Sequence, residues 1–509
     1  MAGASSAAGW REARALVRIL RSGAPLVVFG LALLIVGLAY QERPTYRLMV
    51  GSQTDRPFWR GVNDGERVAG QTYRWTGPTS TLTLPGIGAG AYEVRLELNG
   101  GRPDPYAPPE VVVSGGGAVL AQLTPTPGRQ SYTVAVPSNA TTAGDLRLTL
   151  VTRNPFSPPA DGRVLGVVLS QVDVVPVGRD LALPPLATWL LLALAAALAT
   201  AVLGTAGWSV RAARAGGLLW AAGEAAFLLF DRLWLTLIPG TLVGVLLGAG
   251  ALLLVLGPLW RRLYCAGGIM WPEGEQRGLL AIFAAAFVAR LAGQLHPQTQ
   301  VIDLIFHAHR FEQVLSGQLL FTIPSDEWGG RQTFYLPTPY VLMAPLQWLL
   351  RDELLTIRLF TVTLDTLGVF LAYYLARRAF GDGRAGIIAA LLQVTFPLAV
   401  LPYSWGITAN LFGQFVSLAA VAVAVGAYER LTRPGPWLLL TGVVTLAALS
   451  HPGNVQLIAL LLSGMWVAWG IQAWRGRGTG QGGNRRPWWA FTAALATAAA
   501  IAWFSYYTH

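Results

Sequence analysis

The stretch RLAGQLHPQTQVIDLIFHAHRFEQVLSGQLLFTIPSDEWGGRQTFYLPTPYVLMAPLQ, residues 290–347, determines how the rest of the chain is interpreted. It is a polar segment between long apolar runs, and it is rich in carboxylates, imidazoles and guanidinium groups. Such side chains serve as general acids, general bases and anion ligands. If the protein is an enzyme, we expect its active site in this segment.

The composition is that of an integral membrane protein. Of the 509 residues, 53% are hydrophobic and only 12% are charged, which excludes an ordinary soluble globule. The net charge is +11, but the arginines stand in short loops beside apolar runs, as the positive-inside rule requires. Membrane topology therefore explains the basicity, and we expect no nucleic-acid partner. The single cysteine, Cys265, excludes an internal disulfide.

Apolar runs predict about eleven membrane spans. The first, residues 23–40, follows a tail with four arginines, and we interpret it as an uncleaved anchor because no small-x-small cleavage site follows. The others are 186–206, 216–236, 241–260, 278–295, 357–376, 385–402, 411–428, 437–450, 455–474 and 488–504. The run 216–236 contains three charged residues, and an interfacial amphipathic helix is the alternative there. Residues 334–350 are rich in proline, so we expect a juxtamembrane or re-entrant piece rather than a span.

Residues 41–180 have the pattern of an antiparallel β-sandwich. Leu82 and Leu84, and likewise Leu146, Leu148 and Leu150, fall on one face at period two. The segments YRWTGPTSTLTLP and GRVLGVVLSQVDVV resemble jelly-roll modules of the carbohydrate-binding kind. That resemblance implies a glycan-binding role, although the aromatic residues here suit a sandwich core equally well.

These patterns predict four parts. Residues 1–40 form a cytoplasmic tail and anchor, 41–180 an extracytoplasmic sandwich, 181–277 linking spans, and 278–509 a membrane core with an outer loop at 296–350. With the tail inside, every arginine cluster falls on the cytoplasmic side and the segment 290–347 falls outside. We therefore expect a multi-pass protein of a bacterial inner membrane.

Asp303 and His307 are the candidate catalytic residues. They stand four residues apart, so on a helix they share one face. A carboxylate there can act as general base, with an imidazole that orients it or tunes its pKa. The alternative is that Asp303 caps the helix and His307 only lies in an interface.

The order of elements after this segment resembles the GT-C superfamily of polytopic glycosyltransferases, in particular its protein mannosyltransferase and aminoarabinose transferase branch. Asp303 occupies the acidic position of the outer loop, TFYLPTPYVLMAPL is similar to the proline-rich juxtamembrane piece, and RLFTVTLDTLGVFLAYYLARR to the next span. The resemblance covers residues 278–509. It implies an inverting transfer of a hexosyl or pentosyl group from a polyprenyl-phosphate donor to an envelope lipid, polysaccharide or protein.

Two departures from the family pattern matter. Asp303 has no acidic neighbour, and the nearest adjacent acidic pair is Asp326 and Glu327. Relatives usually continue beyond SYYTH, so a C-terminally truncated fragment is one interpretation. Because Asp303 has no acidic partner, we expect a metal-independent site without a cofactor. The alternative is a divalent metal held by Asp303 and the nearby histidines.

Further polar residues are expected to bind the substrates. Arginine suits a phosphate because its planar fork donates two parallel hydrogen bonds, although each arginine can also be an interfacial anchor. The candidates on the outer side are Arg310, Asp326, Glu327, Arg331, Tyr335, Arg358, Trp405, Asn410 and His451.

We therefore expect a membrane glycosyltransferase that acts on the extracytoplasmic face. One alternative is a non-catalytic scaffold for envelope glycan assembly, which should tolerate loss of Asp303. The other is a transporter of lipid-linked glycan, which would need charged residues in several spans. Only Glu224 and Asp365 meet that requirement.

Overall fold

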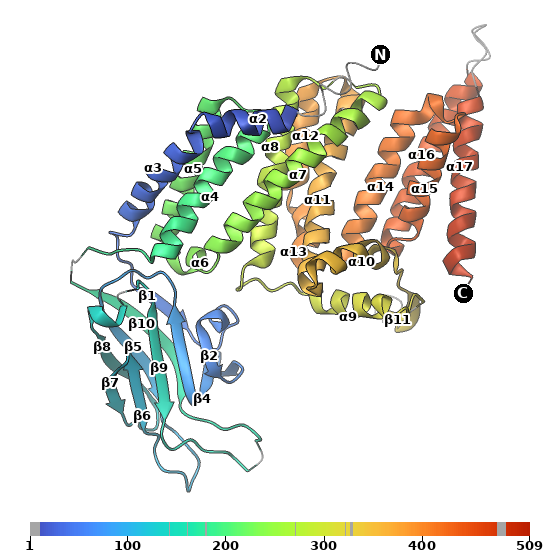
Figure 1. Ribbon diagram of the computed structural model, residues 1–509. Coiled ribbons are helices and arrows are strands. Elements are labelled where there is room, and N and C mark those ends of the chain that lie inside the picture. The colour runs from blue at the N-terminus through green and yellow to red at the C-terminus, as the bar shows by residue number, and fades with distance from the viewer. Residues whose placement is uncertain are drawn as a thin grey trace.

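The structure is a computed structural model, and it describes residues 11–141, 143–159, 161–178, 181–269, 271–320, 322–325, 329–475 and 485–508. Figure 1 shows a row of long helices with a β domain beneath the lower ends of the N-terminal ones. We call these lower ends the β-domain end of the helical domain, and the upper ends the opposite end. The predicted fold class, a helical membrane protein with an antiparallel β domain, is confirmed.

Within the described residues, the β domain contains one antiparallel sheet of ten strands. Their bounds are β1 Tyr46–Met49, β2 Trp59–Val62, β3 Glu66–Val68, β4 Gln71–Leu84, β5 Ala91–Asn99, β6 Val111–Gly115, β7 Ala118–Leu123, β8 Arg129–Val136, β9 Leu146–Thr152 and β10 Val168–Val177. The order is β7-β6-β9-β4-β10-β5-β8, with β1 added to β10 and with β2 and β3 added to β4. Because β7 and β8 at the two ends approach each other, the sheet curls around its core.

Alternate residues of the paired strands fill this core. In β5, Val94 and Leu96 are buried, whereas Arg95 between them is exposed. Leu96 lies opposite Val172 of β10 on one side and Tyr132 of β8 on the other. Side chains of a strand alternate between its two faces, so the predicted period-two pattern is confirmed. The jelly-roll likeness and the domain boundaries stay predictions.

The helices are α2 Arg11–Arg21, α3 Ala24–Ala39, α4 Leu186–Thr205, α5 Val210–Phe230, α6 Arg232–Thr236, α7 Pro239–Ala266, α8 Glu273–Leu295, α9 Leu304–Leu315, α10 Thr338–Leu350, α11 Glu353–Phe380, α12 Gly383–Thr395, α13 Pro397–Trp405, α14 Thr408–Ala427, α15 Pro434–Ala448, α16 Pro452–Arg475 and α17 Arg486–Ala502. A hairpin of β11 Thr322–Ser325 and β12 Arg331–Phe334 separates α9 from α10. Figure 1 shows α9 and α10 lying across the β-domain end, and α2 across the opposite end.

Eight helical segments of the described chain are long and apolar enough to cross a membrane. They are α4, α7, α8, α11, the α12–α13 pair, α14, α16 and α17, and the bent α2–α3 pair would make a ninth. The predicted run 216–236 corresponds to α5, which packs along α3 and α4 and stops before Asp231 caps α6. The run 437–450 corresponds to α15, which has only 15 residues. The total of eleven spans stays a prediction.

Arg232 joins the β domain to the helices. Its buried guanidinium donates hydrogen bonds to the carbonyl of Ile87 at 3.2 Å, and to the carbonyls of Ala39 and Glu42 at 3.2 and 2.6 Å. It also lies 4.3 Å from the ring centroid of Tyr40. One side chain thus satisfies carbonyls from the end of α3 and from the β domain, which fixes the β domain against the helical domain.

Candidate active site

The segment that leads from α8 to α9 is anchored to both parts of the molecule. His296, at the end of α8, stacks on Trp234 of α6 with ring centroids 4.3 Å apart. Gln298 donates from Nε2 to the carbonyl oxygen of Thr54 in the β domain, at 2.8 Å. The backbone that leads to Asp303 is therefore held in place by contacts with α6 and with the β domain.

Helix α9 packs against its neighbours through a narrow buried stripe. Leu304, His307, Phe311 and Val314 are its buried residues, at spacings of three and four. This spacing places them on one face of the helix, as in any amphipathic surface helix. His307 therefore occupies a position in the stripe that is usually apolar.

Asp303 is the N-cap residue of α9, but its carboxylate does not cap the helix. Its main-chain N–H donates to the carbonyl of Trp405 at 3.0 Å. Among the residues that the structure describes, its carboxylate makes no hydrogen bond or ion pair. Partial burial raises the pKa of Asp303 above its ordinary value. A half-buried carboxylate with unused acceptor oxygens is suited to take a proton from a bound group.

Gly406 makes the contact between Asp303 and Trp405 possible. Its φ of +76° is in the left-handed region that glycine adopts without strain. A Cβ at this position would lie 2.2 Å from the Val301 side chain, so the segment before α9 approaches the end of α13 only because no side chain is there. The sequence signal for this contact is a glycine after an apolar run, which is too common to identify it.

Both ring nitrogens of His307 are engaged. Nε2 accepts a hydrogen bond from the main-chain N–H of Thr408 at 3.1 Å, and Nδ1 lies 2.7 Å from Oη of Tyr340. Because Nε2 is the acceptor, the neutral ring carries its proton on Nδ1 and donates it to Tyr340. Burial, and secondly the charge of His451, lowers the pKa of His307 to about 3. The imidazole is therefore neutral near pH 7 and is only 1% exposed.

Two tyrosines connect His307 to the surroundings of Asp303. The hydroxyls of Tyr340 and Tyr335 share a hydrogen bond, and both side chains are buried. Burial raises the pKa of Tyr335 to about 12 and raises the pKa of Tyr340 above its ordinary value, and the charge of Asp303 acts in the same direction. Both hydroxyls thus stay protonated, so Asp303 is close to neutral hydrogen-bond donors.

Two of the predicted binding residues lie beside this group of side chains. Arg310 donates from Nη1 to Oε1 of Gln313 at 2.8 Å, and its guanidinium lies 5.2 Å from the ring centroid of Phe306. Trp405 contributes its carbonyl to Asp303, while its side chain is exposed. Its indole is thus free to meet a ligand or the membrane interface.

Asn410 and His451 come from two further helix starts. The carbonyl of Asn410 accepts from Nδ2 of Asn454 at 3.0 Å, and its Oδ1 accepts from Nε2 of Gln414 at 2.7 Å. Nδ1 of His451 accepts from the N–H of Gly453 at 3.3 Å. The charge of His451 influences His307, so the start of α16 lies close to α9.

The structure brings together Asp303, His307, Tyr335, Trp405 and His451, with Arg310 and Asn410 next to them. It does not connect Arg358 of α11 to this group by any described contact. Asp326 and Glu327 lie outside the described residues, and so does the side chain of Arg331, whose backbone belongs to β12. Their roles stay predictions.

A cavity of about 280 Å³ extends from this region into the helical domain, between α11, α12, α14 and α16. Gln414 and Asn454, which hold Asn410, line it together with Asp365, Gln393, Ser417 and apolar side chains such as Leu457 and Leu461. A second, apolar cavity of about 390 Å³ shares the lining residue Phe415 with it and continues toward the opposite end. The candidate site is therefore next to apolar space that follows α14.

Sequence reasoning did not identify Tyr340 and Thr408 as part of the site. Tyr340 lies in the quoted proline-rich stretch, five residues after Tyr335, but a tyrosine in an apolar segment carries no distinctive signal. Thr408 contributes only its main-chain N–H, which no side-chain pattern can reveal. In the part of the chain that is described, no three histidine, cysteine or acidic side chains gather as a metal site would require. The metal-independent site stays a prediction.

Comparisons with known proteins give one partial relative. Over 157 residues the chain is 30% identical to the undecaprenyl phosphate-alpha-4-amino-4-deoxy-L-arabinose arabinosyl transferase of Pseudomonas aeruginosa (strain UCBPP-PA14). The match covers 30% of this chain and 28% of the relative, so the chain spans well under two thirds of the protein that it matches. No family model and no solved structure matches. The chain is thus similar to part of a sugar transferase.

Proposed function

We propose that the protein is an integral-membrane glycosyltransferase that moves a sugar from a polyprenyl-phosphate carrier to a lipid, polysaccharide or protein of the cell envelope. The observation that carries this proposal is the carboxylate of Asp303, which is half-buried, held by its main chain, and without a described hydrogen-bond partner. The similarity to an arabinosyl transferase supplies the class of donor.

The reaction needs a base more than it needs an acid. A polyprenyl phosphate is a good leaving group, so the main tasks are to deprotonate the acceptor and to hold the phosphate. Asp303 would accept the proton while the acceptor attacks the anomeric carbon from the face opposite the phosphate, which inverts that carbon. Arg310, Arg331 and Arg358 are the candidate phosphate ligands. His307 and its two tyrosines would act by positioning the start of α9.

The apolar space next to the site suits a lipid carrier. The cavity between α11, α14 and α16 begins at Gln414 and Asn454, beside Asn410. An isoprenoid chain in this space would place its phosphate at the β-domain end of the helices. Apolar pockets with a few polar groups at the mouth are typical of sites for such ligands.

The distribution of arginines supports an extracytoplasmic position for the site. Arg261 near the end of α7 and Arg377 near the end of α11 form ion pairs at the opposite end, with Glu12 and Glu275 respectively. Arg430 donates to the carbonyl of Ala266, also at the end of α7, at 2.6 Å. Basic residues accumulate on the cytoplasmic side of membrane proteins, so the β-domain end would face outward.

An ion pair weakens the transporter alternative. Asp365, a carboxylate inside α11, pairs with Arg290 of α8, and both side chains are buried. A compensated charge of this kind holds two helices together and is not available to a moving substrate. The scaffold alternative is left to experiment.

The test measures sugar transfer, or slow hydrolysis, from synthetic polyprenyl-phosphate sugars with purified protein in detergent. The wild type is compared with Asp303→Asn and with Glu312→Gln, which alters an exposed carboxyl on the same helix. We expect Asp303→Asn to lower the rate about 10²- to 10⁴-fold, as loss of a general base does, and Glu312→Gln to retain it.

Circular dichroism and the midpoint of thermal unfolding show whether each variant is folded. Full activity in a folded Asp303→Asn variant would exclude Asp303 as the base. No turnover by the wild type with any donor would contradict the transferase proposal and favour a scaffold.

A further inference from the structure

A polar cavity lies between the β domain and the segment that leads to Asp303. It has a volume of about 590 Å³. One wall comes from the connection between β1 and β2, the connection between β2 and β3, and Arg74 of β4, and the other wall comes from residues 297–300. Gln300 is three residues before Asp303, so their Cα atoms are at most about 11 Å apart. The cavity is therefore next to the candidate active site.

A buried ion pair fixes the β-domain wall of the cavity. Arg74 donates from Nε and Nη2 to the carboxylate of Asp55, at 3.0 and 2.9 Å, and both side chains are buried. The same guanidinium donates to the carbonyl of Ser52 at 2.8 Å and to that of Asn63 at 3.0 Å. One side chain thus joins the two connections that form the wall. A wall that is already in place lowers the entropy cost of binding a ligand.

The opposite wall is held as well. Gln298 donates to the carbonyl of Thr54 at 2.8 Å, which ties this wall to the β domain. Thr299 donates from Oγ1 to the carbonyl of Gly293 in α8, at 2.7 Å. The cavity is therefore bounded by two fixed segments that come from different parts of the molecule.

Four polar side chains in the lining have no partner within the described part of the chain. Gln53, Arg56, Asp64 and Gln300 are exposed, and their side chains make no hydrogen bond or ion pair there. The guanidinium donates, the carboxylate accepts, and each amide does both. This mixed set matches hydroxyl groups, because each hydroxyl can donate and accept.

The charges of the cavity favour a neutral ligand. Arg56 and Asp64 carry opposite charges, and the charge of Arg74 is compensated by Asp55. An anion would be attracted by Arg56 but repelled by Asp64, whereas a neutral ligand rich in hydroxyls can bind both. The volume lies within the range of about 300 to 1,000 Å³ that is usual for small-molecule sites.

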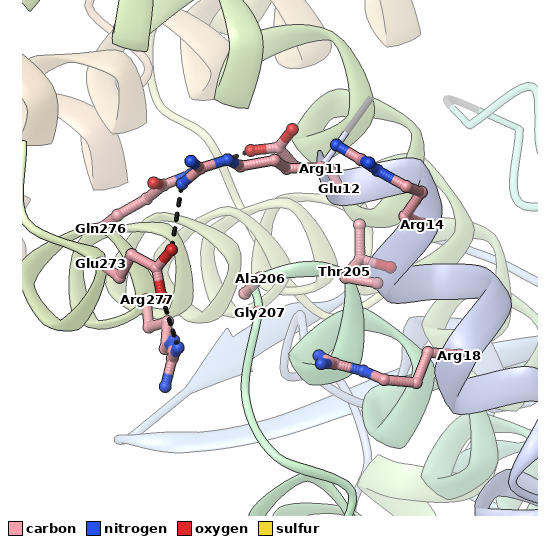
Figure 2. A pocket seen from close by; sticks show the side chains of 11 residues that line it. Arg11, Glu12, Arg14, Arg18, Thr205, Ala206, Gly207, Glu273, Gln276 and Arg277 are labelled. Carbon is pink, nitrogen blue, oxygen red and sulfur yellow. Dashed lines mark hydrogen bonds and ion pairs between the residues drawn. The ribbon is translucent and has the colours of Figure 1, made fainter. Parts of the chain in front are cut away.

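A polar pocket at the opposite end of the helical domain lacks such available carboxylates. It has a volume of about 420 Å³, and the two carboxylates that line it belong to Glu12 and Glu273. Glu273 accepts from Arg11 at 3.1 Å (Figure 2), and Glu12 forms an ion pair with Arg261. These carboxylates hold helices together, whereas that of Asp64 is available to a ligand.

We propose that the cavity beside Asp303 binds a neutral sugar unit of the acceptor. The hydroxyls of the sugar would accept from Arg56 and donate to Asp64, and the amides of Gln53 and Gln300 would bind its other hydroxyls. The acceptor would then be a polysaccharide or glycolipid, with its reacting hydroxyl near Asp303. The role as acceptor rests on the proposed function, whereas the binding of a sugar does not.

The test measures binding of the full chain in detergent to an array of neutral and acidic oligosaccharides, with no sugar donor present. The affinity for the strongest neutral ligand is then measured by isothermal titration calorimetry. We expect Asp64→Ala/Gln300→Ala to weaken this affinity about tenfold or more, because hydrogen bonds that include a charged group are lost. The control Glu110→Ala/Gln122→Ala removes an exposed carboxylate and an exposed glutamine elsewhere on the β domain, and it should bind as the wild type does.

Absence of binding to any neutral oligosaccharide, or stronger binding to acidic ones, would overturn the proposal. Equal affinities of the two double variants would also overturn it, because the sugar would then bind elsewhere. Should Asp64→Ala/Gln300→Ala fail to fold, Arg56→Gln provides the test and must lower the affinity.

The sugar site and the transferase proposal can fail separately. Because binding is measured without turnover, Asp303→Asn should bind the oligosaccharide as the wild type does. A protein that binds the oligosaccharide through this cavity, but transfers no sugar from any donor, would retain the sugar site and contradict only the proposed function. Transfer by a protein whose cavity variants bind as the wild type does would contradict only the sugar site.

Discussion

Glu12 and Asp303 are both carboxylates at the beginning of short helices that lie across the ends of the helical domain, but their surroundings differ. Glu12, in the first turn of α2, is bound by Arg261 and Gln276. Asp303, at the N-cap of α9, has no described partner for its carboxylate. The difference teaches that the presence of a charge partner, more than burial alone, separates a structural carboxylate from one available for chemistry.

The side chains around the two carboxylates follow the same division. At the opposite end, arginines and glutamates form ion pairs. At the β-domain end, a neutral imidazole and two neutral tyrosines lie near Asp303. The first arrangement holds helices together, and the second suits the transfer of a proton. The following predictions test this contrast.

The largest effect is expected at the unpaired carboxylate. If Asp303 is the base, it must be deprotonated, so the rate of transfer should fall about tenfold per pH unit below its pKa. Because burial raises that pKa, the decline should begin at a higher pH than for an ordinary aspartate. A profile of kcat/KM against pH measures this. A rate that stays constant through the ordinary aspartate range would mean that another group is the base.

At the paired carboxylate, the expected loss is one of stability. Glu12→Ala removes the ion pair that Glu12 forms with the largely buried Arg261, and removing one member of a buried ion pair costs about 3 to 5 kcal/mol. Unfolding in detergent, followed by circular dichroism, measures the change, while transfer per folded molecule should remain. A loss below about 1 kcal/mol would show that the pair is not a structural support.

Tyr340→Phe should weaken the neutral group at the β-domain end. The change leaves Nδ1–H of the buried His307 without its acceptor, which costs about 1 to 3 kcal/mol. Tyr507→Phe is the matched control, because it removes a hydroxyl that donates to the carbonyl of Ala448. The free energy of unfolding of both variants is compared with that of the wild type. Equal losses would contradict a special role for the contact with His307.

His307 should make the protein sensitive to acid. Its pKa falls from an ordinary 6.5 to about 3 on folding, so unfolding takes up a proton between these values. The stability from keeping His307 neutral is complete above pH 6.5 and is lost as the pH falls toward 3, at up to about 1.4 kcal/mol per unit. His307→Gln should flatten the dependence of the unfolding midpoint on pH in this window. An unchanged slope would assign the acid sensitivity to other groups.

The smallest effect is expected at the exposed ion pair of the opposite end. The side chains of Arg11 and Glu273 are 50% and 64% exposed, and such pairs contribute about 0 to 1 kcal/mol. Arg11→Ala should therefore change the unfolding midpoint far less than Glu12→Ala, although the two residues are adjacent. A comparable loss would show that the exposed ion pair, and not the buried pair alone, holds α2 in place.

Much of the fold could be predicted because it follows from local periodicity. Apolar runs identified the long helices, and alternating residues such as Leu82 and Leu84 identified the strands. The run 216–236 was harder to interpret, because its charged residues fit either a span or an interfacial helix. They do not reveal that α5 packs along α3 and α4. For the same reason, the total number of spans is not determined by apolarity alone.

The sequence by itself determined the class of protein, the position of the polar segment between spans, and the shared helix face of Asp303 and His307. Only the tertiary structure decided what these side chains meet. His307 accepts from an N–H that is 101 residues away, and Glu12 binds an arginine that is 249 residues away. Such partners depend on how whole helices pack, whereas periodicity reports only which face of a helix is buried. The tertiary structure also decided against the capping alternative for Asp303, whose carboxylate does not cap α9. Whether a side chain caps a helix depends on its geometry, which the residue type does not specify.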